Sequence, residues 1–235
     1  MTFTSELNRF LRRSIGLEIH KTQSSFDEAR MHIINSEKIS LLIDGGANEG
    51  QWATRIRRDG YSGKILSLEP GTKAFSKLEF NSKDDPLWDV DPRALGSCEA
   101  ILPLHLSSND GMSSSLKRPE RHLTEFPSVS FSGIENVSVT TLESLLQDVT
   151  ENVMVKLDIQ GFELEALEGI GVALDKIVAI ELEMTLVPMY RGEASVGRVL
   201  VTLETMGFKL FSISEFGKGK NGSVSYFDVL AIREH

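Results

Sequence analysis

The chain has 235 residues, of which 40% are hydrophobic and 25% are charged, as in an ordinary soluble globular domain with a sizeable core. Its formal net charge of -9 disfavours nucleic acids and anionic membranes as partners, because an acidic surface repels phosphates. Cys98 is the only cysteine, no apolar run approaches the ~18 residues of a spanning helix, and no signal-peptide core opens the chain. We therefore expect a cytoplasmic protein without an intramolecular disulfide or a membrane span.

Residues 1–38 show apolar side chains at helical spacing and are predicted to form an N-terminal helical extension. From residue 39 to 235 we predict one domain in which apolar strands alternate with helices. The predicted strands are 39–43, 64–68, 153–157 and 177–182, and the predicted helices are 51–58, 73–80, 163–168 and 196–206. Strands that are apolar throughout are buried on both faces, so this alternation predicts an α/β fold with a mostly parallel, doubly wound sheet.

The end of the chain departs from this alternation. Two predicted strands, 208–213 and 225–232, flank a glycine-rich loop and have no helix between them. They predict an antiparallel C-terminal hairpin at the edge of the sheet.

Residues 81–137 form the irregular part of the chain, rich in proline and containing a polar stretch at 107–115. A loop of this length inside a compact domain is typical of a lid or binding loop. We expect this loop to shape a substrate pocket, with Ser107 and Asn109 among the substrate contacts.

The turn Asp44-Gly-Gly-Ala-Asn-Glu-Gly50 lies between a predicted strand and a predicted helix. Glycine lets the backbone approach a ligand closely, and in open parallel sheets the ligand crevice lies at the carboxyl ends of the strands. The G-x-G-x-x-G pattern of nicotinamide enzymes fails, because the second glycine would fall on Ala47 or Asn48. A carboxylate such as Asp44 would attract the ammonium group of an amino-acid moiety.

Two further carboxylates end predicted strands. Glu69 follows the second strand, where a carboxylate can accept both hydroxyls of an adenosine ribose. Asp158 follows the third strand and is predicted to face the same crevice as Asp44. It is the first candidate for a general base, and His105 is the second.

The segment from Glu181 to Tyr190 adds two candidates. Glu183 lies near the end of a strand beside Asp158, and the two could hold Mg²⁺, which prefers oxygen ligands. Such an ion would polarise an acceptor hydroxyl. Glu183 and Tyr190 are also predicted substrate contacts, although Tyr190 could equally cover the edge of the core.

Taken together, these segments resemble the FkbM family of methyltransferases over roughly residues 39–213. The matching pieces are 43–50, 67–70, 94–96, 109–115, 139–142, 155–163 and 183–190. A lone D-x-G-A-N-x-G is moderately specific, whereas the same motif followed by E-P and K-x-D-x-Q-G-F-E is strongly so.

The resemblance implies the class I methyltransferase fold, a Rossmann-like sheet of seven strands with one antiparallel strand. It also implies S-adenosylmethionine as methyl donor and transfer to a hydroxyl of a sugar, glycoside, glycolipid or polyketide-type substrate. Its implied cofactor contacts are Asp44, Gly45, Gly46, Ala47, Asn48, Gly50, Gln51, Glu69, Pro70, Ala94, Leu95 and Asp158.

Two other functions stay open at this point: another adenosine-cofactor enzyme, such as an NAD-type oxidoreductase, and a catalytically silent binding module. The missing glycine argues against the first. The three strand-end carboxylates argue against the second. The oligomeric state is open as well, and the N-terminal helix is a plausible contact in a homodimer.

Overall fold

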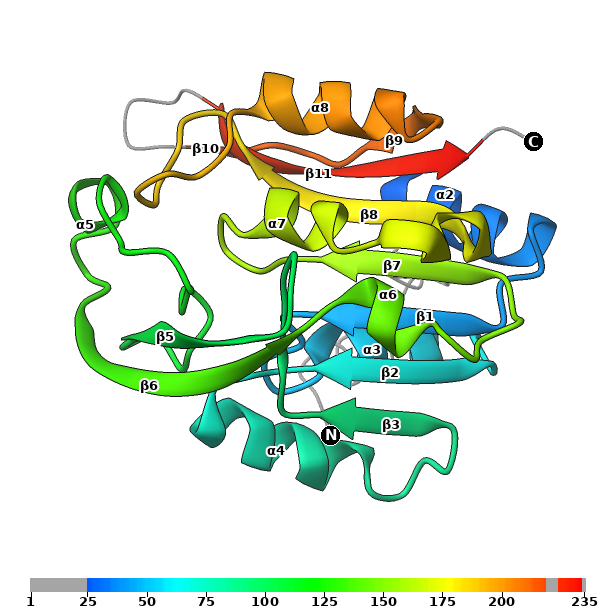
Figure 1. Cartoon of the computed structure of the whole chain (residues 1–235), viewed down its shortest axis with the longest axis horizontal. Helices are drawn as coiled ribbons and strands as arrows, with labels where there is room; N and C mark the ends of the chain where they lie inside the picture. The colour runs from blue at the N-terminus through cyan, green and yellow to red at the C-terminus, as the bar shows by residue number, and fades with distance from the viewer. Residues whose placement is uncertain (1–24, 219–223, 234–235) are drawn as a thin grey trace, which may run out of the picture.

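The computed structural model describes residues 25–218 and 224–233. At its centre is a sheet in the order β10-β11-β8-β7-β1-β2-β3, with β9 also paired to β11 (Figure 1). The strands of this sheet are β1 (Leu41–Gly45), β2 (Lys64–Leu68), β3 (Trp88–Asp91), β7 (Val153–Leu157), β8 (Ile177–Thr185), β9 (Phe208–Ile213), β10 (Gly217–Lys218) and β11 (Val224–Arg233).

Neighbouring strands from β3 to β8 pair in parallel, whereas β11 is antiparallel to both β8 and β9. The predicted parallel sheet and its antiparallel C-terminal hairpin are confirmed. The two-residue β10 adds a short eighth strand to the seven that were expected.

Helices cover both faces of this sheet and give a three-layer domain (Figure 1). On one face, side chains of α2, α3 and α4 share a core with Leu42, Ile65 and Met154. On the other face, α6, α7, η1 and α8 share a core with Ile43 and Val155. The helices are α2 (Ser25–Ser36), α3 (Gln51–Arg58), α4 (Thr72–Ser82), α5 (His122–Glu125), α6 (Leu142–Leu145), α7 (Glu163–Glu168), the 3₁₀ helix η1 (Gly171–Lys176) and α8 (Val196–Thr205).

The prediction that residues 81–137 are irregular was wrong. They contain β3, and a second sheet of order β4-β6-β5 is built from β4 (Ala94–Leu95), β5 (Ala100–Ser107) and β6 (Phe131–Thr140). Pro103 lies within β5, which is tolerated because β5 pairs only with β6 and is an edge strand of this small sheet.

The longest stretch outside these strands is residues 108–130, called the covering segment below. Its two ends meet, since Ser108 N donates to Ser130 O at 2.9 Å and Ser130 N donates to Ser108 Oγ at 3.0 Å. Figure 1 shows the segment, with α5, beyond the carboxyl ends of the central strands.

Of the predicted N-terminal extension, residues 1–24 lie outside the described residues, and Ser25–Ser36 form α2. Phe26, Ile33 and Ile34 of α2 are buried in the core of the main sheet. Among helices within residues 25–218 and 224–233, none has the length and hydropathy needed to cross a lipid bilayer.

Candidate active site

A cavity of about 640 Å³ lies at the carboxyl ends of the central strands. Its wall includes Gly46 after β1, Glu69 after β2, Asp158 after β7 and Glu183 near the end of β8. The volume falls within the range of small-molecule sites. The parallel register explains the convergence, because each of these strands delivers its carboxyl end to the same edge of the sheet.

The loop between β1 and α3 forms one side of the cavity. Gly46 has a φ of +72°, and a Cβ there would lie 2.0 Å from the carbonyl oxygen of Asp158. Asn48 also has a positive φ, and its side-chain Nδ2 donates to Asp110 O of the covering segment at 2.9 Å. Glycine is therefore required at position 46, where two backbone segments meet at the cavity.

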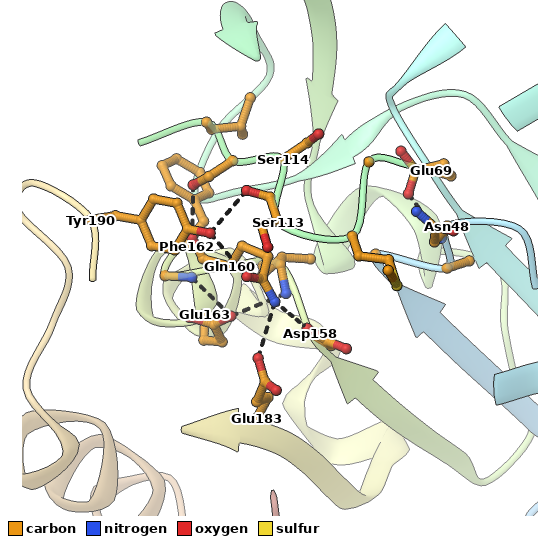
Figure 2. A pocket seen from close by; sticks show the side chains of 18 of the residues that line it. Asn48, Glu69, Ser113, Ser114, Asp158, Gln160, Phe162, Glu163, Glu183 and Tyr190 are labelled. Atoms are coloured by element: carbon orange, nitrogen blue, oxygen red, sulfur yellow. Dashed lines mark hydrogen bonds between the residues drawn. The ribbon is translucent and has the colours of Figure 1, made fainter. Parts of the chain in front are cut away.

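Glu69 directly follows β2 and lines the cavity, and it is only 8% exposed. Its carboxylate accepts hydrogen bonds from Gly71 N at 2.8 Å and Asn48 N at 2.9 Å (Figure 2). Burial raises the pKa of Glu69 to about 7, although these two N–H groups favour the charged form. The two hydrogen bonds fix the carboxylate between the first loop and the start of α4.

Asp44, a predicted cofactor contact, is fully buried and is not among the residues that line the cavity. Its neighbour in the register between β1 and β7 is Lys156, whose Nζ lies 3.2 Å from Asp44 Oδ1 and 3.6 Å from Asp158 Oδ2. Burial alone would lower the pKa of Lys156, but the Asp44 and Asp158 carboxylates more than offset it and raise that pKa. Asp44 therefore neutralises a buried lysine beneath the cavity.

Asp158 and Glu183 do converge, as predicted, but the side-chain amide of Gln160 lies between them (Figure 2). Gln160 Nε2 donates to Asp158 Oδ1 at 2.8 Å and to Glu183 Oε2 at 3.0 Å. The described residues also contain no group of three or more His, Cys, Asp or Glu placed to hold a metal ion. In this arrangement the predicted Mg²⁺ ligands do not fit a cation, because a hydrogen-bond donor fills the space between them.

A third carboxylate adds to this end of the cavity. Asp228 of β11 lies directly opposite Glu183 in the antiparallel register and also lines the cavity. Burial, followed by repulsion from Asp158 and Asp228, raises the pKa of Glu183 well above its ordinary value. Burial and nearby carboxylates raise the pKa of Asp228 to about 6. The three close carboxyl groups therefore disfavour an anionic ligand at this end of the cavity.

Glu163, at the first position of α7, has a structural role. Its Oε1 accepts from Ile159 N at 3.0 Å and Gly161 N at 3.2 Å, which holds the turn that carries Gln160. Burial raises the pKa of Glu163 to about 7 despite these N–H donors.

The covering segment contributes His122, which is 5% exposed and lines the cavity. Its ring packs against Phe126, Phe131 and Tyr190 at centroid distances of 4.9, 5.3 and 5.6 Å. Burial lowers the pKa of His122, which favours the neutral imidazole. His105, the predicted second candidate for a base, lies on β5 but does not line this cavity, whereas its neighbour Leu104 does, because successive side chains of a strand point to opposite faces of the sheet.

The structure thus brings most of the predicted site residues to one cavity. Those on its wall are Gly46, Ala47, Asn48, Gln51, Glu69, Pro70, Ala94, Leu95, Asn109, Asp158, Glu183 and Tyr190. Those that are not on its wall are Asp44, Gly45, Gly50, His105 and Ser107. Ser107 instead lines a separate, smaller cavity with Glu69 and Gly71.

The wall also includes Arg30, Gln160 and Asp228, which were not among the predicted site residues. Gln160 carried a signal, since it lies two residues after Asp158 in the same strand-end motif. Arg30 and Asp228 carried none, because helix packing and an antiparallel strand bring them to the cavity.

Comparisons with known proteins point the same way. The model of the "Methyltransferase FkbM domain" family matches residues 44–210. The chain is 22% identical over 239 residues to the 2-O-methyltransferase NoeI of Sinorhizobium fredii, covering 93% of this chain and 97% of that protein.

Solved structures of similar shape include TehB from Haemophilus influenzae, with 7% identity, a TM-score of 0.49 and coverage of 97% of this chain and 67% of that chain. Another is an rRNA methylase from Streptococcus thermophilus, with 11% identity, a TM-score of 0.48 and coverage of 92% and 100%.

The family match extends from the first strand-end loop to β9 and contains the loop after β1, Glu69 and the strand-end motif of Asp158. The sheet order, with a single antiparallel strand between β8 and β9, is that of the class I methyltransferase fold. The chain belongs to the FkbM family of methyltransferases.

Proposed function

We propose that this methyltransferase uses S-adenosylmethionine to methylate a hydroxyl oxygen of a carbohydrate-like acceptor. The observation that carries the proposal is the meeting of the Gly46 loop, the Glu69 carboxylate and the Asp158 carboxylate around one cavity. S-adenosylmethionine supplies a methyl group activated by its sulfonium. One of these elements is available for each of its amino-acid, ribose and reactive portions.

The cofactor would occupy the half of the cavity nearest β1 and β2. Gly46 keeps the backbone free of a side chain there, and the buried Glu69 carboxylate can accept ribose hydroxyls on lone pairs that Gly71 N and Asn48 N leave free. Ala94 and Leu95 supply apolar surface suited to the adenine ring. The residues present therefore fit S-adenosylmethionine.

The acceptor would occupy the half of the cavity under the covering segment. Aromatic and apolar side chains of that segment face a polar wall containing Glu183, Tyr190 and Asp228. Such a pairing suits a sugar ring, which has an apolar face and hydroxyls around its edge. The name of the distant relative, a 2-O-methyltransferase, supports oxygen as the methylated atom.

In the reaction, the acceptor oxygen forms a bond to the methyl carbon as the carbon–sulfur bond breaks, with its electron pair passing to sulfur. We assign the acceptor proton to Asp158, whose side chain is 37% exposed at the cavity wall. The cavity supplies the positioning that such a displacement requires. The proposed function and its two alternatives predict that different ligands bind to the protein. A measurement of ligand binding is therefore the first test.

The test is calorimetric titration of the protein with S-adenosylmethionine, its demethylated product and NAD. We expect the two sulfur ligands to bind and NAD not to bind. Glu69→Gln should weaken binding of the product by roughly 10–200-fold, because a hydrogen bond to a charged group is lost. Glu151→Gln, beyond the opposite end of the sheet, is the matched control and should leave the affinity unchanged. If neither sulfur ligand binds, the proposal is wrong.

The assignment of the base is tested by comparing Asp158→Asn with His122→Gln in a methyl-transfer assay on a panel of glycosides. Asp158→Asn should lower kcat by roughly 10²–10⁴-fold, whereas product affinity should change little. Asp175→Asn, an exposed carboxylate in η1, is the control. A large loss of kcat in His122→Gln, together with a small loss in Asp158→Asn, would transfer the role to His122.

A further inference from the structure

Gln160 is held in a conformation that few residues with a side chain adopt. Its φ is +56°, in the left-handed region, directly before Gly161. The backbone carbonyl of Gln160 accepts a hydrogen bond from Ser115 Oγ at 2.7 Å. Such a conformation persists only where the surrounding structure maintains it. Here it places the Gln160 side chain at the cavity.

The orientation of the Gln160 amide is fixed by its partners. Tyr190 Oη lies 3.0 Å from Gln160 Oε1 and 2.9 Å from Ser113 O and donates its one hydrogen to one or the other, and the carbonyl end of the amide faces Tyr190 (Figure 2). The Nε2 end must then face Asp158 and Glu183, and its two hydrogens serve one carboxylate each. Tyr190 is 3% exposed, so water does not readily replace its hydroxyl.

The two carboxylates need this donor. Asp158, Glu183 and Asp228 end or line three neighbouring strands, and repulsion among them helps raise the pKa of Glu183 and of Asp228. The nearest buried cation, Lys156, already lies between Asp44 and Asp158. In a metal site a divalent cation would draw two such carboxylates together. Here the Gln160 amide fills that position.

We propose that Gln160 is a positioning residue that holds the Asp158–Glu183 pair in place of a divalent cation, so that this carboxylate pair acts without a bound metal. Gln160 also connects the pair to Tyr190 and the covering segment, so the orientation of Asp158 is coupled to the position of that segment. The role in orienting Asp158 rests on the proposed function. The exclusion of the cation does not.

The wild-type protein provides the first experiment, with Mn²⁺ as the probe, read by electron paramagnetic resonance of the free ion. We expect no saturable binding at this site up to about 1 mM Mn²⁺, because the ion would have to displace the amide and break its bond to Tyr190. Saturable binding in the wild type that Glu183→Gln abolishes would overturn the proposal. This measurement needs neither the methyl donor nor the acceptor.

The second experiment is Gln160→Glu, which replaces the amide by a third carboxylate at the same position. It should create a Mn²⁺ site with a Kd below about 100 μM, since three converging carboxylates suit a hard cation. The double variant Gln160→Glu/Glu183→Gln should lose this gain. The exposed Gln147→Glu adds the same charge away from the cavity and should bind no ion here.

A folded Gln160→Glu protein that binds no Mn²⁺ at about 1 mM would contradict the proposed geometry. Far-ultraviolet circular dichroism establishes folding, and the wild-type measurement decides if this variant does not fold. Both experiments measure only the binding of Mn²⁺. Their outcome therefore does not depend on binding of S-adenosylmethionine, which the calorimetric titration tests separately. With a glycoside acceptor, kcat of the wild type should be unchanged by a chelator.

Discussion

Gly46 is the point where the first strand-end loop comes closest to the turn after β7. The absence of a side chain allows the Asp158 carbonyl to pack against the Cα of Gly46. The loop after β1 and the turn after β7 are therefore in direct contact. Gly192 offers a matched comparison, because it has a nearly identical φ of +75° and no atom within 4 Å of a Cβ built there.

We predict that Gly46→Ala lowers the free energy of unfolding by about 2–4 kcal/mol, through backbone strain and the clash with Asp158 together. Gly192→Ala carries the strain alone and should cost about 1 kcal/mol. Urea unfolding of the two variants measures the difference. Equal losses would show that the approach of the two loops is not tight.

At this scale the sequence predicts which positions end strands but not where each side chain goes. Glu69 and Asp158 reach the cavity as predicted, because parallel strands deliver them to one edge. Asp44 ends a strand equally well, yet it pairs with Lys156 beneath the cavity. That pairing exists because β1 lies beside β7, although the two strands are more than a hundred residues apart in the sequence. The local sequence around Asp44 therefore does not predict it.

At the scale of elements, the β/α alternation and the terminal hairpin were predictable because each element has its own periodicity. The β5–β6 pairing was not, since Pro103 and the polar stretch that follows β5 indicate a loop when read locally. The partner of β5 lies beyond the covering segment. The location of α2 against the sheet was equally hidden, and it brings Arg30 to the cavity.

Arg30 joins α2 to β8 through a buried pair. Its Nη2 donates to Glu181 Oε1 at 2.8 Å, and the two residues are 3% and 4% exposed. Arg30→Met should lower the free energy of unfolding by about 3–5 kcal/mol, because it leaves the Glu181 carboxylate buried without its cation. Adding Glu181→Leu should restore most of the loss, as thermal and urea unfolding will show.

The exposed pair of Lys64 and Glu151 serves as the control for this comparison. Lys64→Met should leave the free energy of unfolding nearly unchanged, since solvent screens the pair. If the double variant at Arg30 and Glu181 were no more stable than Arg30→Met, the loss would have to come from packing of the arginine side chain rather than from an isolated charge.

For the whole molecule, the buried carboxyls set the dependence of stability on pH. The pKa values of Glu69 and Glu163 are raised to about 7, so between the ordinary glutamate value and pH 7 the folded state binds more protons than the unfolded state. Their contribution to stability is therefore present at low pH and is lost as the pH rises through 7. The lowered pKa of His122 makes stability rise with pH instead, but only below the ordinary pKa of histidine.

We predict that Glu69 and Glu163 together lower the free energy of unfolding by about 2–3 kcal/mol between pH 6 and pH 8, roughly one pKa unit for each. The raised pKa values of Glu183 and Asp228 add to this fall. Urea unfolding at the two pH values measures the total, and Glu163→Gln should reduce it by about 1 kcal/mol. A stability that rises over the same interval would show that these carboxyls are charged in the folded protein.

The meeting of Ser108 with Ser130 gives the covering segment a further property. Because the two ends are already hydrogen-bonded to each other, the loop between them is closed whatever its length. Doubling the length of a closed loop costs only about 0.6 kcal/mol of chain entropy. Residues can therefore be inserted or exchanged there while the strands that carry Gly46, Glu69 and Asp158 keep their register. Under the proposed function, acceptor choice can therefore change by exchange of residues in this segment, provided that Ser113 and Ser115, which hold Tyr190 and Gln160, are kept.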